Sequence, residues 1–212
     1  MSLRKLTDVL DSQTLFFARA TLFADQFEGV LPALVRNEWP GVAEWIRDAR
    51  RQSYVNCWHM NTHESFHMWQ QYLAGEPGVV IQSSFRRLTE SFAATGLAIF
   101  AGEIRYIDYS SDLLWGWNSN VNIFAPLMHK RLEFASDQEI RAIVNPLSGV
   151  ALAARQNDQP GIRVDVGLDV LIDQIRLMPG ADVTLRTTVE SHLRAARLSK
   201  VVLASSIDAV PP

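Results

Sequence analysis

Apolar residues recur along the chain at two spacings, one typical of helices and one typical of strands. Leu3, Leu6 and Leu10 share one face of a predicted helix, whereas Leu15–Arg19 is a short strand-like run. The same patterns predict helices at 33–52 (interrupted near Pro40-Gly41), 61–73, 85–94, 122–134, 168–173 and 183–197, and strands at 54–58, 79–83, 97–100, 103–109, 139–144, 162–166, 174–178 and 200–203. Because short turns join several neighbouring elements, this order favours an α+β fold with a mixed, mostly antiparallel sheet and packed helices.

Length and composition fit one domain. The chain has 212 residues, of which 48% are apolar, and chains of this size bury roughly 70% of the surface that is exposed when they are unfolded. No internal repeat and no long linker divides the sequence. We therefore expect a single domain over residues 1–212.

Charge and cysteine content exclude several classes of protein. The chain carries 20 Lys and Arg against 23 Asp and Glu, a net charge of −3, so it shows no strong signal for a nucleic-acid partner. Cys57 is the only cysteine, which excludes an internal disulfide, and we expect it to be a small buried residue on its strand. The apolar runs are shorter than the ~18 residues of a membrane span, and no export signal opens the chain. We expect a cytoplasmic protein without a membrane partner; no feature indicates an oligomeric state.

Residues 63–67 match the His-Glu-x-x-His pattern of zinc hydrolases. On a helix, His63 and His67 lie on one face and can share a zinc ion, with Glu64 as the base beside a metal-bound water. No third ligand follows at the spacing of the longer zinc motifs. Asn61 and Glu64 also have the spacing of a helix capping box, which gives Glu64 a structural role. Zinc-dependent hydrolysis is therefore an alternative hypothesis.

Several separated segments together resemble a known bacterial family. In chain order these segments are Leu15-Phe16-Phe17-Ala18-Arg19, Asp25-Gln26-Phe27-Glu28-Gly29, Asn56-Cys57-Trp58-His59, Glu64-Ser65, Met68-Trp69, Tyr72, Gly78-Val79, Ile104-Arg105-Tyr106, His129-Lys130-Arg131, Phe134 and Gln138-Glu139-Ile140-Arg141. Over nearly the whole chain this set resembles the family called domain of unknown function twenty-nine seventy-one. The resemblance implies an intracellular bacterial protein, sometimes encoded near mobile elements or defence genes, and brings no established activity.

The resemblance has two further implications. The family pattern does not need a histidine at position 67, which weakens the zinc alternative. Relatives usually carry a basic-aromatic strand before the first helix, whereas this chain begins at Met1-Ser2-Leu3. The resemblance therefore implies that an N-terminal strand is missing, as a late start codon would produce.

Charged and aromatic residues of these segments form a candidate nucleotide site. The expected ligand-binding residues are Arg19, Asp25, Glu28, Trp69, Tyr72, Arg105, Tyr106, Lys130 and Arg141. We expect Arg105, Lys130 and Arg141 to bind phosphate, because cationic side chains make strong charge-assisted hydrogen bonds to it. Tyr72 or Tyr106 would stack on a base or nicotinamide ring. Glu139 is the candidate catalytic residue, which would bind a ribose hydroxyl or stabilise positive charge at the anomeric carbon.

The order of these residue types is similar to the layout of ADP-ribosyl-transfer folds, an analogy of order and type only. The first hypothesis is therefore a nucleotide-handling enzyme that uses NAD or another nucleotide, and it requires Arg105, Tyr72, Glu139 and Arg141 to face one cavity. Zinc is the cofactor of the alternative. A third hypothesis is a non-catalytic interaction module linked to phage defence, because no catalytic constellation is complete and six tryptophans would suit a binding face. Ordinary roles are also open: Trp69 and Tyr72 in the core, and Glu139 with Arg141 as a surface ion pair.

Overall fold

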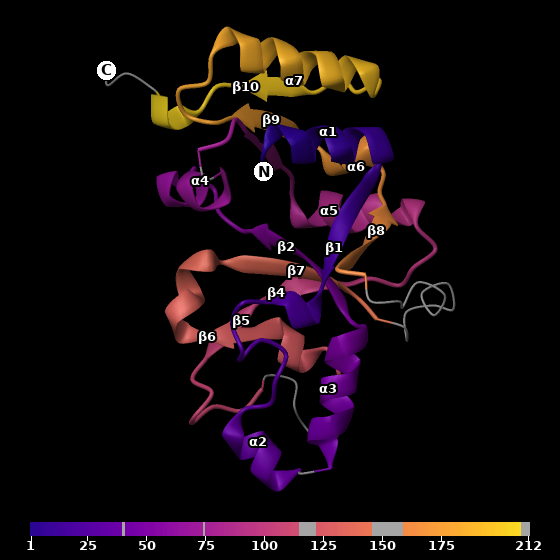
Figure 1. Ribbon diagram of the computed structural model, residues 1–212, viewed down its shortest axis with the longest axis vertical. Helices are drawn as coiled ribbons and strands as arrows, with labels where there is room; N and C mark the ends of the chain where they lie inside the picture. The colour runs from indigo at the N-terminus through magenta and orange to yellow at the C-terminus, as the bar shows by residue number, and fades with distance from the viewer. Residues whose placement is uncertain (40, 74, 115–121, 146–158, 209–212) are drawn as a thin grey trace. The chain divides into compact units, whose positions relative to one another are not determined.

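The computed structural model describes residues 1–39, 41–73, 75–114, 122–145 and 159–208 (Figure 1). The chain divides into two compact units. Unit 1 comprises residues 1–15, 61–95 and 164–212, and unit 2 comprises residues 16–60 and 96–163. Each unit has its own secondary structure, and each is described by itself.

The boundaries between the units lie at points that the composition of the sequence does not mark. Strands β1 (Thr14–Arg19) and β8 (Gly161–Asp165) each contain a boundary, and the other two boundaries follow Met60 and Thr95. None of these points lies in a Pro-, Gly- or Ser-rich linker, the usual sign of a domain boundary in a sequence. The expectation of a single domain over residues 1–212 stays a prediction.

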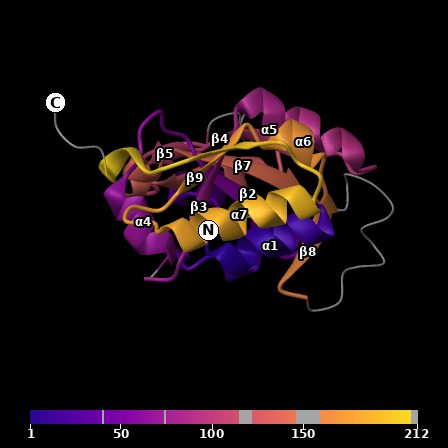
Figure 2. The ribbon, with the colours of Figure 1, turned by 90° about the horizontal axis from the view of Figure 1, so that it is seen from above.

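Unit 1 contains a three-stranded sheet and several helices. The strand order is β10-β9-β3, with β9 parallel to β10 and antiparallel to β3. Helix α1 contacts α7, where Thr7 Oγ1 and His192 Nε2 are 3.4 Å apart (Figure 2). The elements are α1 (Leu3–Ser12), α4 (Phe66–Leu73), β3 (Val79–Gln82), α5 (Phe85–Ser91), η2 (Phe92–Ala94), α6 (Leu168–Leu171), β9 (Gln174–Leu177), α7 (Val183–Ala195), β10 (Val201–Leu203) and η7 (Ser206–Asp208).

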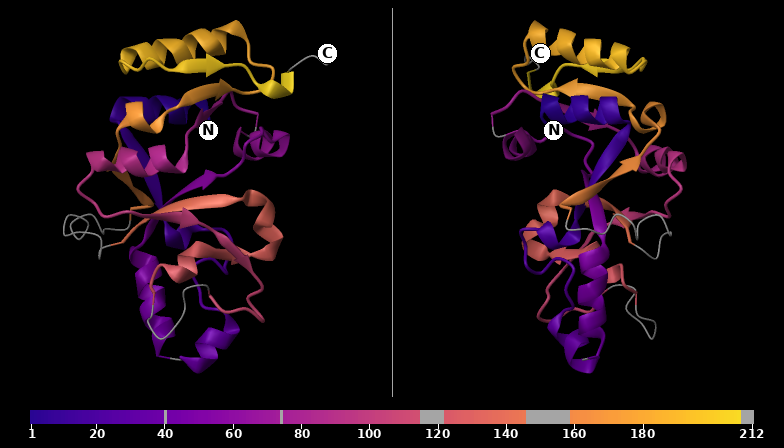
Figure 3. Two further views of the ribbon diagram at one scale, coloured as in Figure 1. Left: turned by 180° about the vertical axis from the view of Figure 1, so that it is seen from behind. Right: turned by 45° about the vertical axis from the view of Figure 1, so that its right-hand side comes forward.

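Unit 2 contains most of the strands of a five-stranded sheet and a separate strand pair. The sheet order is β4-β7-β2-β1-β8, and β2 pairs antiparallel with both β1 and β7. Strands β5 and β6 pair in parallel. Figure 3 shows the ribbon from two further sides. The elements of unit 2 are η1 (Ala20–Leu22), α2 (Ala33–Glu38), α3 (Val42–Gln52), β2 (Tyr54–His59), β4 (Phe100–Glu103), β5 (Arg105–Ile107), η3 (Ala125–Met128), β6 (His129–Arg131), η4 (Leu132–Asp137) and β7 (Glu139–Val144).

Strand β7 is the most buried element of unit 2, since all six of its residues are buried. Successive side chains of a strand point to opposite faces, so Glu139, Arg141 and Ile143 share one face. Ile143 packs there with Val55 and Leu127 in a small apolar cluster. This packing places two charged residues of β7 beside a hydrophobic core.

The structure confirms the α+β class and a mostly antiparallel main sheet with packed helices. Among the helices of the described residues, none has the length and apolar character needed to cross a bilayer. The predicted helix 122–134 is wrong: the chain forms η3, β6 and η4 there, because β6 pairs with β5. The predicted break between strands 97–100 and 103–109 is also misplaced: β4 covers Phe100–Glu103, with Gly102 opposite Arg141, and β5 begins at Arg105.

Candidate functional site

Arg141 lies at the centre of a network of charged side chains in unit 2 and is only 1% exposed. Its Nε donates to Glu139 Oε1 at 2.5 Å, its Nη1 donates to the carbonyl oxygen of Leu127 at 2.8 Å, and its Nη2 donates to Glu28. The guanidinium carbon is 4.6 Å from the centre of the Phe23 ring. All three nitrogens therefore have acceptors, as a buried cation requires.

Lys130 of β6 extends this network. Its Nζ donates to Asp137 Oδ2 at 2.7 Å and to Glu139 Oε2 at 3.1 Å. The carboxylate of Glu139 therefore binds two cations, and its backbone N–H donates to the Tyr106 hydroxyl at 2.9 Å. We call Glu28, Lys130, Asp137, Glu139 and Arg141 the ion network.

The network fixes the charge of its members. Burial alone raises the pKa of Glu139, but the charges of Arg141 and Lys130 outweigh it and lower the pKa below its usual range. Burial alone lowers the pKa of Lys130, but Asp137 and Glu139 outweigh it and raise the pKa. Both groups are therefore ionised at neutral pH. A carboxylate in this state stabilises its neighbours and is a weak proton acceptor.

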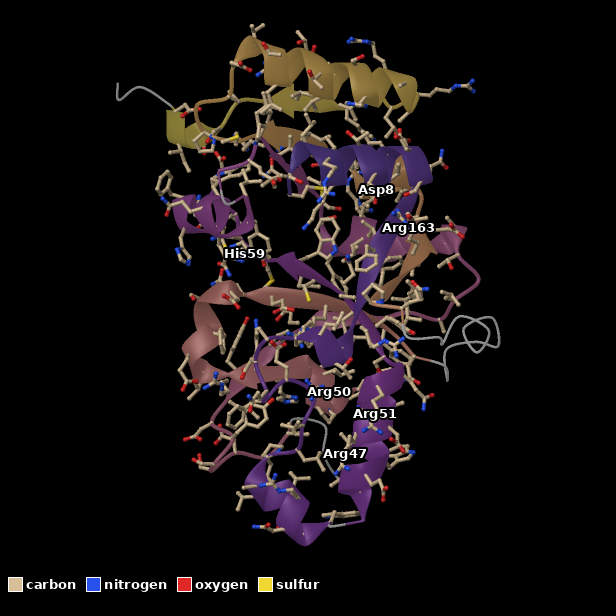
Figure 4. All side chains as sticks on the ribbon, viewed as in Figure 1. Asp8, Arg47, Arg50, Arg51, His59 and Arg163 are labelled. Carbon is tan, nitrogen blue, oxygen red and sulfur yellow. The ribbon has the colours of Figure 1, made fainter. Side chains whose placement is uncertain are left out.

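Cys57 lies on β2 directly opposite Arg141. Its side chain is exposed, so the expectation of a buried residue is wrong. Although the thiol has solvent access, the surrounding protein partly desolvates it, and this desolvation raises the pKa of Cys57. Arg141 opposes the shift, whereas Glu139 adds to it. His59, labelled in Figure 4, lies opposite Glu139, and its Nδ1 hydrogen-bonds to the backbone oxygen of Asp137 at 2.5 Å.

Arg131 follows Lys130 on β6 and therefore points to the other side of the strand. Its Nε donates to Asp25 Oδ2 at 3.1 Å. Its guanidinium carbon is 4.8 Å from the centre of the Phe27 ring and 5.2 Å from that of Phe134, both within cation–π distance. The hydrogen bond from Arg131 to Asp25 raises the pKa of Arg131, so this guanidinium is a permanent cation held between fixed partners.

A pocket of about 500 Å³ in unit 2 is lined by Arg131. Its volume is within the ~300–1,000 Å³ typical of small-molecule sites. The lining is apolar at Phe27, Val30, Leu31, Pro32, Ile107 and Leu132, and charged at Arg36, Asp108, Arg131 and Glu133. The pocket therefore combines apolar and aromatic walls with cationic and anionic groups.

The structure brings five of the predicted site residues into contact: Glu28, Tyr106, Lys130, Glu139 and Arg141. They come from distant segments, and the pairing of Tyr106 with Lys130 across β5 and β6 brings two of them together. Asp25 accepts a hydrogen bond from Arg131, the residue that follows Lys130 on β6. The assumed surface ion pair between Glu139 and Arg141 is wrong, because both residues are buried.

The other predicted residues lie elsewhere. Arg105 is exposed and on the opposite side of β5 from Tyr106. Arg19 donates from Nε to the carbonyl oxygen of Gln159 at 3.0 Å, away from the ion network. Trp69 and Tyr72 belong to unit 1, where Trp69 is buried as a core residue and Tyr72 is 60% exposed. A core role for Tyr72 is therefore wrong.

Nothing in the residue pattern singles out Arg36 and Asp108, which line the pocket, and Arg131 is visible in the sequence only as a member of the His129-Lys130-Arg131 segment. Treating residues 122–134 as a helix hid the strand that separates Lys130 from Arg131. His129, Lys130 and Arg131 are all polar, so no alternation marks them as a strand. What makes them a strand is their pairing with Arg105, Tyr106 and Ile107, which also brings Lys130 beside Tyr106.

The zinc alternative depends on a helix that starts before His63, but α4 begins at Phe66. Ser65 Oγ accepts from the backbone N–H of Met68 at 3.3 Å, so Ser65 caps the helix and the Asn61 capping box is wrong. His63 and His67 are both exposed. No group of three or more metal-ligating side chains is assembled within the described residues.

Glu64 itself is engaged within unit 1. Its Oε1 accepts from Ser205 Oγ at 3.0 Å and from Trp69 Nε1 at 3.2 Å, and its Oε2 accepts from the backbone N–H and the hydroxyl of Ser206. Arg176 Nη1 is 3.7 Å away. Burial alone raises the pKa of Glu64, but the hydrogen bonds, chiefly those from Ser206, lower it. The carboxylate thus ties the segment before η7 to α4.

One observation bears on the interaction-module hypothesis. Trp39, at the end of α2, is 37% exposed and Trp45, on α3, is 47% exposed. Trp58 is half-buried and Trp69 is buried, while Trp115 and Trp117 lie outside the described residues. Two exposed tryptophans suit a binding face. The partner and the link to phage defence remain predictions.

Comparisons of the sequence and the structure with known proteins found no matching family model, no matching curated protein and no matching solved structure. The resemblance described above therefore stays a prediction. The functional proposal depends on the geometry of unit 2.

Proposed function

We propose that unit 2 binds a nucleotide-type ligand, carrying a nucleobase and a phosphate, in the pocket lined by Arg131. The observation that carries the proposal is the position of the Arg131 guanidinium near the Phe27 and Phe134 rings, in a pocket that also contains Arg36. Flat bases stack on aromatic rings and on arginine planes, and guanidinium groups bind phosphate.

The two arginines differ in what they offer a ligand. Arg131 is held by Asp25 and by its ring contacts, so it supplies a preorganised surface. Arg36 is exposed at the pocket, and its guanidinium forms no hydrogen bond or ion pair with the residues that the structure describes. A phosphate is therefore expected at Arg36 and a base at Arg131.

The ion network supports this site from the other side of β6. Lys130 and Arg131 are consecutive, so the bonds from Lys130 to Asp137 and Glu139 also fix the backbone that presents Arg131. In this proposal Glu139 and Arg141 position the strand. This differs from the role expected for them from the sequence, in which they contacted the ligand.

The proposal is restricted to binding. Transfer of an ADP-ribosyl group requires a carboxylate that faces the ligand, whereas both oxygens of Glu139 bind cations and Glu139 does not line this pocket. Zinc hydrolysis is not proposed either, because Glu64 is held by Ser205, Ser206 and Trp69.

Calorimetric titration of the whole chain with AMP tests the proposal. We expect saturable binding and at least a tenfold weaker affinity in Arg36→Gln, because a charge-assisted hydrogen bond contributes about 1.5–3 kcal/mol. Arg47→Gln is the matched control, since Arg47 is an exposed arginine on α3 that does not line the pocket (Figure 4). Equal losses in both variants, or no binding of any nucleotide to the wild type, would contradict the proposal.

A further inference from the structure

We infer that this pocket selects nucleoside monophosphates over nucleoside triphosphates and dinucleotides. The inference rests on the proposed function and adds the class of nucleotide. It follows from the charges that line the pocket and from its size.

The charged residues that line the pocket leave one cation available to bind a phosphate group. Two cations, Arg36 and Arg131, and two carboxylates, Asp108 and Glu133, line it. Arg131 is already paired, with its Nε 3.1 Å from Asp25 and its Nη1 4.0 Å from Glu133. Arg36 is left as the cation that can neutralise a ligand, and each additional phosphate would add negative charge near carboxylates. A triphosphate is therefore repelled where a monophosphate is bound.

The two carboxylates also suit the sugar. Glu133 has a side chain that is 70% exposed, so its oxygens are available as acceptors. Asp108 Oδ1 accepts from the backbone N–H of Ser110 at 2.8 Å and from its hydroxyl at 2.6 Å, which fixes the carboxylate at the pocket wall. Ribose hydroxyls donate hydrogen bonds to such oxygens, whereas phosphate oxygens do not. The carboxylates thus favour the sugar and disfavour further phosphates.

The size of the pocket also favours a nucleoside monophosphate over a dinucleotide. A volume of about 500 Å³ is in the lower half of the range for small-molecule sites. A dinucleotide consists of two nucleoside units joined by two phosphates, so it would place one unit outside the lining residues. That outer unit would gain no contact with the Arg131 and Phe27 surface, and its additional phosphate would lie near the carboxylates.

The test is a calorimetric comparison of AMP, ADP, ATP and NAD on the whole chain in a chelator-containing buffer, which keeps divalent cations from screening the phosphates. We expect AMP to bind at least fivefold more tightly than ATP and NAD, with ADP between. Glu133→Gln removes one exposed negative charge without removing the acceptor oxygen, so it is expected to tighten ATP binding about threefold and to change AMP binding less.

The outcomes separate the two proposals. If ATP or NAD binds as tightly as AMP, the inference about the class of nucleotide is overturned and nucleotide binding at the pocket stands. If Glu133→Gln leaves the ratio of the ATP and AMP affinities unchanged, the charge argument is overturned. If none of the four probes binds, the proposed function itself is overturned.

Discussion

At the scale of single residues, the Arg141 side chain links two buried carboxylates, Glu28 and Glu139, of which Glu139 also binds Lys130. Replacing Arg141 with Met is expected to lower the free energy of unfolding by about 3–5 kcal/mol, because Glu28 and Glu139 would lose their buried partner. Urea unfolding measures the change as a lower midpoint at constant slope. A triple variant (Glu28→Gln, Glu139→Gln, Arg141→Met) should recover most of the loss, since it removes all three charges. If the single variant were as stable as the wild type, a structural role of the network would be excluded.

Cys57 reports on the same network through its reactivity. Glu139 raises the pKa of the Cys57 thiol, so Glu139→Gln is expected to lower that pKa and speed alkylation by iodoacetamide several-fold at pH 8. Because Cys57 is the only cysteine, mass spectrometry of the intact protein follows the reaction directly. Glu133→Gln, outside the network, should react at the wild-type rate. An unchanged or slower rate in Glu139→Gln would mean that the carboxylate does not act on the thiol.

At the scale of elements, Glu64 joins α4 to the chain segment that leads into η7. Replacing Glu64 with Ala leaves the hydroxyls of Ser205 and Ser206 and the backbone N–H of Ser206 without their acceptor. We expect faster proteolytic cleavage in residues 204–208 and little change in cleavage of α1, measured by limited proteolysis with mass spectrometry. Glu64→Gln keeps one acceptor oxygen and should show an intermediate effect. If neither variant changes the cleavage rate, Glu64 does not anchor this segment.

The spacing of apolar residues predicted well those elements whose buried residues recur at a constant interval along the chain. Helix α1 buries Leu6, Val9 and Leu10 on one face, and α7 buries Leu185, Val189 and Leu193, so the helical spacing is visible in the sequence. Residues 122–134 have no such regularity. There Pro126 lies in η3 and the three-residue strand β6 depends on pairing with β5, a partner more than twenty residues away in the chain. Local pattern cannot reveal a short strand that exists because of a distant one.

At the scale of the whole molecule, the sequence indicated the right residue types but not their roles. Glu28, Lys130, Glu139 and Arg141 were predicted as one site and do contact one another, since oppositely charged residues in otherwise apolar segments tend to pair when buried. Whether these charged side chains bind one another or face a ligand depends on how deeply they are buried. The order of residues in the chain does not reveal that burial. The division into two units is likewise invisible in the sequence, and it places Trp69 and Tyr72 in unit 1 and the ion network in unit 2.

The stability of the molecule should depend on pH through His129, which is buried and donates from Nδ1 to the carbonyl oxygen of Ala125 at 2.6 Å. Burial lowers the pKa of His129 and the charge of Arg105 adds to this, although the bond to Ala125 opposes it. The folded state therefore binds fewer protons than the unfolded state below the unfolded pKa of about 6.5. The stability contributed by neutral His129 is fully present above that pH and is lost as the pH falls below it, with a slope of at most about 1.4 kcal/mol per pH unit.

Urea unfolding of the wild type and of His129→Gln at several pH values between 5 and 7.5 measures this dependence. We expect the wild type to lose stability towards pH 5 and the variant to show a shallower slope, because glutamine does not titrate. His67→Gln is the control, since His67 is exposed on α4 and its replacement should leave the slope unchanged. Glu139 does not interfere in this window: its pKa is lowered, so its contribution to stability is fully present above the ordinary carboxyl pKa of about 4.3 and is lost as the pH falls from there towards the lowered pKa. Parallel slopes for the wild type and His129→Gln would show that proton binding to His129 is not coupled to folding.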